Sequence, residues 1–247
     1  MAFKFKKFTV EDSDCAMKVG TDSVLLGAWI NYTSTANILD VGTGCGLLAL
    51  IAAQNTNATI TAIEIDFKAF CQAMQNFVNS SWSNRLTCIN NDFRAFASEY
   101  YNQMSEDKVN DSACGFDMII SNPPYFTNSL KSSITSRNTA RHNSVLPIYE
   151  LIHYAKLLLK KNGHLNIVFP VPDYEQLDLV CIQEGLAATR KTFVIPRKGK
   201  RPNRVLLEYS IESPGNIEMS ELTIRDENGF YTNDYLRLTN PYYLHLH

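Results

Sequence analysis

The chain alternates between two patterns of apolar positions. Short and almost continuous apolar runs are typical of strands buried on both faces, whereas apolar residues spaced three and four apart are typical of helices. The predicted strands are residues 38–41, 59–64, 85–92, 116–121 and 163–170, and the predicted helices between them are residues 47–54, 67–80, 146–160 and 173–184. This alternation predicts an α/β fold with a mostly parallel, doubly wound sheet.

The pattern changes after residue 184. The segments TRKTFVIP (residues 189–196) and RVLLEYSIE (residues 204–212) are both strand-like, and the polar stretch RKGKRPN between them predicts an antiparallel hairpin. Together with the five earlier strands, this C-terminal hairpin gives a seven-stranded sheet and forms one of its edges. Two polar stretches, residues 103–115 and 127–145, have no regular pattern, and loops of such length are usually functional or disordered.

Residues 1–37 precede the first predicted strand and form a preamble to a core at residues 38–247, within a single domain. Apolar positions from Val24 to Trp29 have helical spacing, with Thr21 or Asp22 as a candidate cap.

Two later segments complete the pattern. In the helix predicted over residues 67–80, the apolar residues share one face, and they are Phe67, Phe70, Met74, Phe77 and Val78. The last eight residues, NPYYLHLH, are interpreted as a final strand or as a tail.

Composition narrows the classes of protein and of partner. The formal net charge is −2, so a polyanionic partner must be met by a local basic patch and not by the charge of the whole molecule. The six cysteines include no C-x-x-C pair, which indicates buried thiols of a reduced compartment and neither a disulfide framework nor a zinc site. No segment resembles a signal peptide or a membrane span, so we expect a cytoplasmic protein without membrane contact.

The sequence DVGTGCG (residues 40–46) connects the first predicted strand to the next helix. Glycines in such a turn allow close approach of a ligand, and the helix start offers free N–H groups. Gly42, Gly44 and Gly46 have the spacing G-x-G-x-G, which differs from the G-x-G-x-x-G of a dinucleotide-binding fold. Asp40 precedes the first glycine by two positions, and its carboxylate favours a ligand with an ammonium group over a pyrophosphate.

Acidic residues also lie at the ends of the next two predicted strands. Glu64 ends the second strand, where a carboxylate can accept hydrogen bonds from both hydroxyls of a ribose. Asp92 ends the third strand within reach of an adenine amino group, and Phe93 can cover the adenine ring. Ammonium, ribose and adenine together describe S-adenosylmethionine. The alternatives are a NAD site, which the position of the third glycine disfavours, and a glycine-rich connection with incidental acids.

The sequence NPPY (residues 122–125) follows the fourth predicted strand. The prolines stiffen the chain, remove two backbone donors and favour an extended Asn122. The side-chain oxygen of Asn122 and the carbonyl of Pro123 can accept both hydrogens of a flat amino group, on which Tyr125 can stack. Two acceptors would stabilise the positive charge that develops as a methyl group arrives. The alternative is a plain Pro-Pro turn.

These motifs resemble those of class I S-adenosylmethionine-dependent amino-methyltransferases, with a Rossmann-like fold. The preamble DSDCAMKVGTDSVLLGAW and the loop TSRNTARHN resemble more narrowly the tRNA1(Val) (adenine-37-N6)-methyltransferase family, over nearly the whole chain. The resemblance implies N6-methylation of the adenine next to the anticodon, with Asn122, Pro123 and Tyr125 as catalytic residues. The expected cofactor contacts are Thr21, Asp40, Gly42, Gly44, Gly46, Glu64, Ile65, Asp92, Phe93 and Asn122, with no metal.

Three other functions stay open from the sequence. NPPY is shared with glutamine N5-methyltransferases that act on proteins and with rRNA or DNA adenine methyltransferases. A non-catalytic cofactor-binding or RNA-binding subunit is the third, and the intact NPPY argues against it.

Three basic clusters are candidates for contact with a tRNA anticodon stem-loop. A base of such a loop is poorly paired, so flipping it out of the loop costs little free energy. Contact with the phosphate backbone of the RNA requires cationic side chains. The first cluster has seven basic residues and no acid between residues 190 and 204. Lys4, Lys6 and Lys7 form the second cluster, and Lys131, Arg137 and Arg141 form the third. The expected RNA contacts are Lys4, Lys6, Lys7, Arg137, Arg141, Arg197, Lys198, Lys200, Arg201 and Arg204. No stable protein partner is implied.

Overall fold

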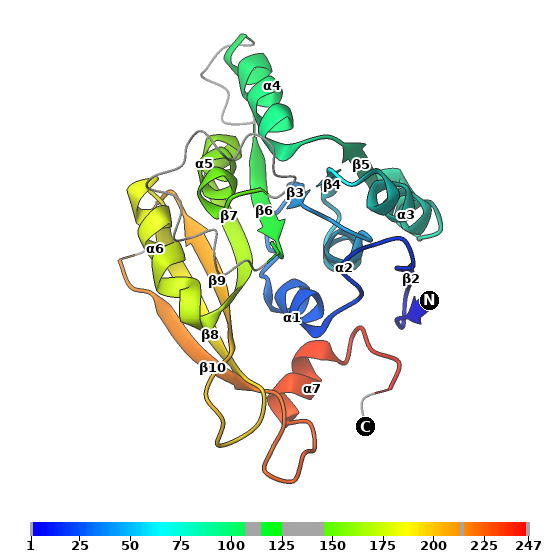
Figure 1. Cartoon of the computed structure of the whole chain (residues 1–247), viewed down its shortest axis with the longest axis vertical. Coiled ribbons are helices and arrows are strands. Elements are labelled where there is room, and N and C mark those ends of the chain that lie inside the picture. Colours follow the sequence, from blue (N-terminus) through cyan, green and yellow to red (C-terminus); the bar gives the residue numbers. More distant parts are fainter. Residues whose placement is uncertain (1, 107–114, 125–145, 213–214, 246–247) are drawn as a thin grey trace.

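The computed structural model describes residues 2–106, 115–124, 146–212 and 215–245. Its centre is an eight-stranded sheet with the strand order β10-β8-β9-β7-β6-β3-β4-β5, and a separate two-stranded sheet contains β1 and β2 (Figure 1). The strands are β1 (Ala2–Lys4), β2 (Thr9–Glu11), β3 (Asn37–Val41), β4 (Thr59–Glu64), β5 (Leu86–Asn90), β6 (Phe116–Ser121), β7 (Leu159–Pro170), β8 (Ala187–Ile195), β9 (Arg204–Ser210) and β10 (Glu218–Thr223). The helices are α1 (Thr21–Trp29), α2 (Leu47–Asn55), α3 (Phe67–Val78), α4 (Phe93–Glu106), α5 (Ile148–Leu158), α6 (Tyr174–Gln183) and α7 (Asn233–Thr239).

The predicted α/β class with a mostly parallel sheet is confirmed, and so is the antiparallel hairpin, formed by β8 and β9. The sheet has one strand more than the seven predicted. The extra strand is β10, which pairs in parallel with β8 at the outer edge. Four of the six residues of β10 are exposed. Its sequence, EMSELT, therefore lacks the continuous apolar run that would predict a strand.

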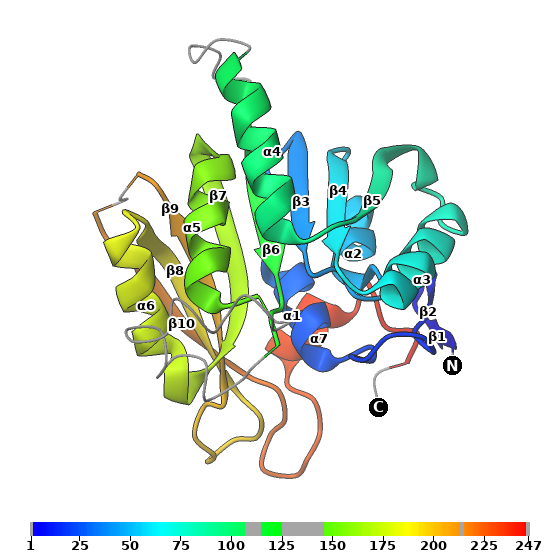
Figure 2. The same ribbon diagram turned by 45° about the horizontal axis from the view of Figure 1, so that its top comes forward.

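The sheet lies between two layers of helices. Figures 1 and 2 show α4, α5 and α6 on one side of the sheet and α1, α2 and α7 on the other. Successive strand residues point to opposite faces, and both faces are buried: Ile38 of β3 packs in the cluster that contains α1 and α2, whereas Leu39 packs in the cluster that contains α4, α5 and α6. Burial on both faces explains the continuous apolar runs of the sequence.

The expected apolar face of α3 is not the face that packs inward. Phe67 is 65% exposed and Val78 is 63% exposed, whereas Phe77 is buried. The inward face also contains Ala69, Gln72, Ala73 and Asn76. The two polar residues are buried there because they bind the preamble and the glycine turn: Asn76 Nδ2 donates to the carbonyl oxygens of Glu11 and Cys45 at 2.8 Å each. The spacing of apolar residues alone cannot predict that a polar residue is buried through hydrogen bonds to another segment.

Two other local expectations are also corrected. Residues 103–106, expected to be irregular, continue the helix α4, which the sequence pattern missed because its residues are mixed in polarity. Among the cysteines in the described part of the chain, Cys71 is exposed, although all were expected to be buried.

The end of the described chain is neither a strand of the central sheet nor a loose tail. After α7, the chain packs against the preamble, where the backbone N–H of Lys6 donates to the carbonyl of Tyr242 at 2.8 Å and Phe5 forms an antiparallel bridge with Tyr243. The rings of Phe5 and Tyr243 stack with centroids 5.9 Å apart. Tyr242 is 3% exposed, so this residue belongs to the hydrophobic core.

One edge of the sheet brings together the segments predicted to be functional. The strands β3, β4, β6 and β7 are parallel neighbours, and β8 runs in the same direction because both it and β7 are antiparallel to β9. Their C-terminal ends therefore lie at one edge, which we call the C-terminal edge. Glu64 ends β4 at this edge, and the glycine turn, Asn122 and the hairpin loop at residues 196–203 follow strands there. None of the helices in the described part of the chain has the length and apolar character needed to span a bilayer.

Candidate functional site

The turn between β3 and α2 has a backbone that three glycines make possible. Gly42, Gly44 and Gly46 have φ angles of +70°, +56° and +84°, in the left-handed region that other residues rarely adopt. No atom lies within 4 Å of a Cβ built on Gly42 or Gly44. This open space beside the backbone is what close approach of a ligand requires.

Gly46 has a different surrounding. A Cβ at this position would lie 2.5 Å from Cε1 of the Phe77 ring in α3. Its N–H donates to the carbonyl of Thr43 at 2.9 Å, which closes the turn. Gly46 is therefore required first by packing between the turn and α3.

This packing gives a prediction for stability. Gly46→Ala should lower the free energy of unfolding by about 2–4 kcal/mol, because it combines a left-handed non-glycine residue with an overpacked contact. Gly199→Ala is the matched control: Gly199 has a φ of +82° and nothing within 4 Å of a built Cβ. Chemical denaturation of both variants measures the difference. Equal losses would show that the Phe77 ring moves aside without cost.

Glu64 closes the glycine turn from the end of β4. It is 8% exposed, and its Oε2 accepts from the N–H of Gly44 at 2.8 Å while its Oε1 accepts from the N–H of Asp66 at 2.9 Å. Asp66 in turn caps α3 by accepting from the N–H of Ala69. The carboxylate is thus held at the C-terminal edge with its orientation fixed by two backbone donors.

Asp40 lies beneath the same turn with no exposed surface. Its Oδ2 accepts from Thr43 Oγ1 at 2.5 Å and from the N–H of Ala49 at 3.1 Å. Its Oδ1 is buried and has no hydrogen-bond partner among the described residues. Burial is the main cause that raises the pKa of Asp40 to about 7. A cationic group nearby would favour its charged form.

A pocket opens beside Glu64, between the ends of β3, β4 and β5. Its lining includes Gly42, Glu64, Ile65, Asp92 and Phe93. All five were predicted cofactor contacts, so the fold brings them together.

Asp92, within this pocket, is paired with a residue that sequence analysis missed. The carboxylate accepts from the backbone N–H and the guanidinium of Arg94, with 2.8 Å between Oδ1 and Nε. The side-chain hydrogen bond from Arg94 is the main cause that lowers the pKa of Asp92. Arg94 also reaches Glu150 of α5 at 3.2 Å. The sequence signal for this pair was the position of Arg94, a cation two residues after Asp92 in NDFR (residues 91–94).

Asn122 and Pro123 lie directly beside the glycine turn. Ser121 Oγ donates to the carbonyl of Val41 at 2.9 Å, which ties the end of β6 to the end of β3. Asn122 Nδ2 donates to the hydroxyl oxygen of Ser23 in α1 at 2.9 Å. Both Asn122 and Pro123 are partly exposed. Tyr125 lies outside the described residues.

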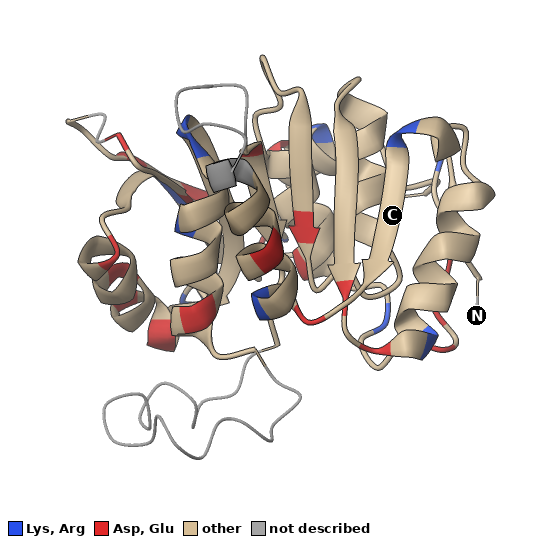
Figure 3. Cartoon of the chain, turned by 90° about the horizontal axis from the view of Figure 1, so that it is seen from above, with Lys and Arg blue, Asp and Glu red and all other residues tan. Residues whose placement is uncertain are grey.

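The residues of the site fit S-adenosylmethionine. The orphaned Oδ1 of Asp40 and the open space over Gly42 and Gly44 match a methionine end with its ammonium group. Glu64 and the pocket with Ile65, Asp92 and Phe93 match the ribose and adenine. Thr21 is exposed as the first residue of α1, near Ser23. Figure 3 shows acidic residues at the ends of central strands, as a cationic ligand requires.

The basic residues of the hairpin divide into two groups. Lys191 is 9% exposed and pairs with Asp178, and Arg190 pairs with Glu208 at 3.2 Å and lies over the Trp29 ring. These two of the seven cations are therefore structural and not part of a surface patch.

The remaining five hairpin cations lie at the C-terminal edge. Arg204 pairs with Asp22 at 2.8 Å, and Lys198 pairs with Glu227 at 3.0 Å. Arg197 donates to the carbonyl of Glu227. Lys200 and Arg201 are exposed at the loop.

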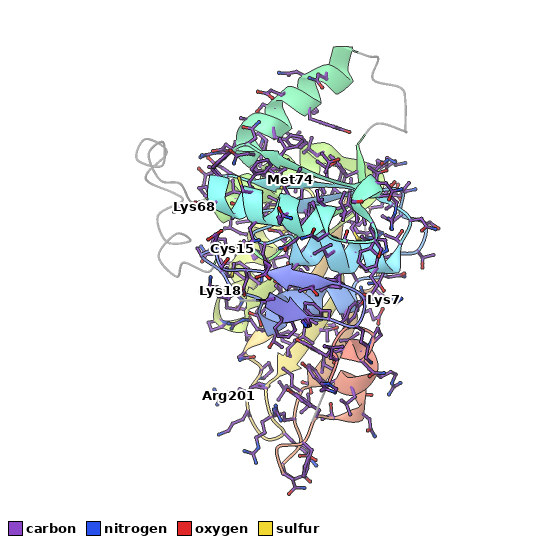
Figure 4. All side chains as sticks on the ribbon, turned by 90° about the vertical axis from the view of Figure 1, so that its right-hand side faces the viewer. Lys7, Cys15, Lys18, Lys68, Met74 and Arg201 are labelled. Carbon is purple, nitrogen blue, oxygen red and sulfur yellow. The ribbon has the colours of Figure 1, made fainter. Side chains whose placement is uncertain are left out.

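The other two basic clusters are less well placed. Lys6 Nζ donates to the carbonyl and side-chain oxygens of Asn240, so its charge is engaged by the C-terminal segment. Figure 4 shows Lys7 on the opposite side of the ribbon from Lys18, Lys68 and Arg201. Lys4 is exposed on β1. Lys131, Arg137 and Arg141 lie outside the described residues.

Comparison with known proteins adds sequence relatives to this geometry. The family model described as "Methyltransferase small domain" matches residues 14–179. A tRNA1(Val) (adenine(37)-N6)-methyltransferase from Parabacteroides distasonis is 38% identical over 98% of this chain and 97% of its own length. Proteins of the same name from Bacteroides thetaiotaomicron and Pseudoalteromonas translucida are 40% and 36% identical, over 99% and 98% of this chain and 98% of each relative.

Solved structures support the fold alone. A predicted O-methyltransferase from Agrobacterium tumefaciens has a TM-score of 0.67 at 19% identity, over 90% of this chain and 96% of that one. A glycopeptide N-methyltransferase in complex with S-adenosylmethionine has a TM-score of 0.52 at 12% identity, over 79% of this chain and 90% of that one. Because the domain model spans more than half of its residues and the relatives align over nearly their whole length, the chain belongs to the tRNA1(Val) (adenine(37)-N6)-methyltransferase family.

Proposed function

We propose that the protein transfers a methyl group from S-adenosylmethionine to the N6 amino group of adenine 37 in tRNA1(Val). The observation that carries the reaction is the place of Asn122: it follows β6, beside the glycine turn of β3, and Ser121 ties the two strand ends together. The name shared by relatives at 34–40% identity supports the substrate.

Each residue of the site has a distinct task in this reaction. S-adenosylmethionine, when bound, supplies an electrophilic methyl group on a sulfonium. Asp40 and the glycine turn would hold its amino-acid end, Glu64 its ribose, and Asp92 with Phe93 its adenine. These contacts would fix the methyl donor relative to Asn122, which is proximity in a reactive geometry.

Asn122 and Pro123 would act on the substrate. Their oxygens would accept the two hydrogens of the adenine amino group and stabilise the positive charge that builds on nitrogen. The exocyclic amine of adenine is a weak nucleophile because it is conjugated with the ring, and its hydrogen bonds to two acceptors reduce that conjugation. Tyr125 would supply the stacking surface for the extruded base.

The hairpin loop at residues 196–203 is the proposed contact for the anticodon stem-loop. It shares the C-terminal edge with Asn122, and it contains exposed Lys200 and Arg201. Lys68 lies on the same side as Arg201 in Figure 4. Lys18 also lies on that side, and its ammonium donates to the carbonyl oxygens of Asp12 and Ser13. A tRNA substrate makes the cytoplasm the expected compartment.

The reaction is tested by transfer of labelled methyl groups. Purified protein with labelled S-adenosylmethionine should label total tRNA from cells that lack this gene, and it should leave total protein from the same cells unlabelled. A tRNA1(Val) transcript should be methylated, and the same transcript with guanine at position 37 should not. Label in protein would instead indicate the glutamine N5 activity. Label in neither fraction would contradict the proposal.

The RNA contact gives a separate prediction. Replacing Lys198, Lys200 and Arg201 with alanine should weaken tRNA binding and flatten its dependence on salt, because each phosphate contact adds about 0.7–0.9 to the slope of log K against log salt. Cofactor binding should not change. Fluorescence anisotropy with labelled tRNA at several salt concentrations measures both quantities.

A matched pair of single variants controls for loss of charge alone. Lys161→Ala removes a cation that is 82% exposed near the start of β7, at the opposite edge of the sheet. Lys200→Ala should weaken tRNA binding more than Lys161→Ala does. Equal effects would show that the hairpin is an ordinary solvated surface.

A further inference from the structure

We propose that Phe230 is a stacking platform for an unpaired base of the tRNA anticodon stem-loop. The turn that contains it, at residues 224–232 between β10 and α7, would form one RNA-binding surface with the hairpin loop at residues 196–203. This inference deepens the proposed function and rests on it. It adds to the cations of the hairpin loop an aromatic contact that the charge pattern of the sequence does not indicate.

The β10–α7 turn lies at the same edge of the sheet as the glycine turn and Asn122. Because β10 is parallel to β8, both strands end at the C-terminal edge, and the turn follows β10 there. Figures 1 and 2 show the turn and the hairpin loop side by side, projecting from the sheet. The two loops are therefore neighbours on the side where the target base would bind.

The separation of the turn from the methyl-transfer site suits a nucleic acid. In the strand order, β10 is four positions from β6, which is about 19 Å at about 4.8 Å per strand. Five or six stacked nucleotides, at about 3.4 Å each, span that distance. A stem-loop with its target base at Asn122 can therefore reach the turn.

Hydrogen bonds and an ion pair join the two loops. The backbone N–H of Lys198 donates to the carbonyl of Arg225 at 2.8 Å, and Nζ of Lys198 pairs with Glu227 at 3.0 Å. The guanidinium of Arg197 donates to the carbonyl oxygen of Glu227. These contacts hold the turn against the hairpin loop as one surface.

The combined surface is positively charged. Residues 196–203 and 224–232 together contain five cations and two acids, a net charge of +3 in a chain whose net charge is −2. Lys200 and Arg201 are exposed at the hairpin loop. A local excess of cations is what contact with a phosphate backbone requires in a protein of acidic total charge.

The β10–α7 turn is preorganised by its own hydrogen bonds. Asp226 Oδ1 accepts from the backbone N–H groups of Asn228 and Phe230 at 2.8 and 2.9 Å. The N–H of Asp226 donates to the carbonyl of Phe230 at 2.8 Å. Nη1 of Arg225 donates to the carbonyl of Gly229 at 2.6 Å. A backbone held in this way loses little conformational entropy when a ligand binds to it.

The ring of Phe230 is left in solvent by this turn. At 67% exposed, it is the most exposed large apolar side chain in the described part of the chain. The ring of the next residue, Tyr231, is instead used by the fold, since it lies under the guanidinium of Arg225 and stacks on Tyr235. Single apolar residues on a surface are common. An exposed ring on an ordered turn among cations is, however, the combination that binds single-stranded nucleic acid.

Fluorescence anisotropy with a labelled anticodon stem-loop of tRNA1(Val), at several salt concentrations, tests the proposal. Phe230→Ala should weaken binding by at least about fivefold, the lower bound for one base stacked on an aromatic ring. Phe230→Tyr should bind as wild type does, and Phe230→Leu should lose as much as alanine because leucine has no π-face. The slope of log K against log salt should not change in these variants, because no phosphate contact is lost. Lys200→Ala should lower that slope.

Tyr101→Ala is the control for loss of an exposed ring. Tyr101 is 43% exposed on α4, which Figure 1 shows at the end of the molecule opposite to the two loops. Equal effects of Phe230→Ala and Tyr101→Ala would overturn the inference, and so would wild-type affinity in Phe230→Ala or in Phe230→Leu. A loss of affinity in Phe230→Ala together with a lower salt slope would also overturn it, because the cations and not the ring would then explain the loss.

A measurement independent of methyl transfer distinguishes failure of the inference from failure of the proposed function. Phe230→Trp adds a fluorophore at the turn to the two tryptophans of the chain, Trp29 and Trp82. The stem-loop should quench the emission of this variant more than that of wild type, and a fully paired RNA duplex should not. If tRNA is not methylated but this quenching occurs, the proposed function fails and the stacking surface stands. If tRNA is methylated without additional quenching, the inference fails alone.

Discussion

Replacing Asn122 with alanine should lower the single-turnover rate of tRNA methylation by on the order of 10²–10³-fold, as when one preorganised partner of a developing charge is lost. The hydrogen bond from the target amine is worth most in the transition state, so the rate should fall more than substrate affinity does. Asn122 is partly exposed, and its removal leaves the strand end anchored by Ser121 to Val41. The fold should therefore survive.

Asn122→Asp is the sharper comparison. Aspartate keeps an acceptor, so this variant should retain more activity than Asn122→Ala at neutral pH. Ser23 provides the reason that it should not reach the wild-type rate: the carboxylate has no N–H to donate to the Ser23 hydroxyl oxygen. A wild-type rate in Asn122→Ala would refute the clamp, and NPPY would then be a structural turn.

Replacing Glu64 with alanine should weaken binding of S-adenosylmethionine by roughly 1.5–3 kcal/mol, which is the loss of hydrogen bonds to a charged acceptor. The structure adds a second cause. Without the carboxylate, the N–H groups of Gly44 and Asp66 lose their acceptor, so the turn itself is released. Isothermal titration calorimetry measures the change.

Glu64→Gln separates these two causes. Glutamine keeps one acceptor oxygen but directs an NH2 group at one of the two backbone N–H groups. It should therefore fall between wild type and alanine in affinity. A folded Glu64→Ala protein with unchanged affinity would remove Glu64 from the cofactor site.

The features that the sequence predicted best are the site residues at the ends of strands. Asp40, Glu64, Asp92 and Asn122 each follow or end a short apolar run, and parallel strands bring such ends to one edge. Their convergence needed only the direction of the strands. Gly42 and Gly44 were likewise identified, because glycines in a turn between a strand and a helix allow close approach of a ligand, and both have the positive φ angles that glycine adopts readily.

Contacts between distant segments could not be predicted in this way. Ser23 and Asn122 are 99 positions apart, and nothing in the periodicity of α1 marks a serine that faces another element. The inward Asn76 of α3 was missed for the same reason, because its partners are backbone carbonyls of β2 and of the glycine turn. The pairing of Lys191 with Asp178 also needed the tertiary fold, since a charge run in the sequence does not show which cations are buried.

The packing of the C-terminal segment on the preamble has a consequence for how the enzyme is made. Lys6 and Asn240, which are hydrogen-bonded, are 234 positions apart, and Phe5 bridges to Tyr243. Because a ribosome adds roughly 5–20 residues per second, Asn240 is synthesised tens of seconds after Lys6. During that time the first-made segment, including the helix that holds Asn122, lacks its last packing partner. Nascent chains should therefore acquire methyl-transfer competence only after this C-terminal segment has been translated and has packed on the preamble.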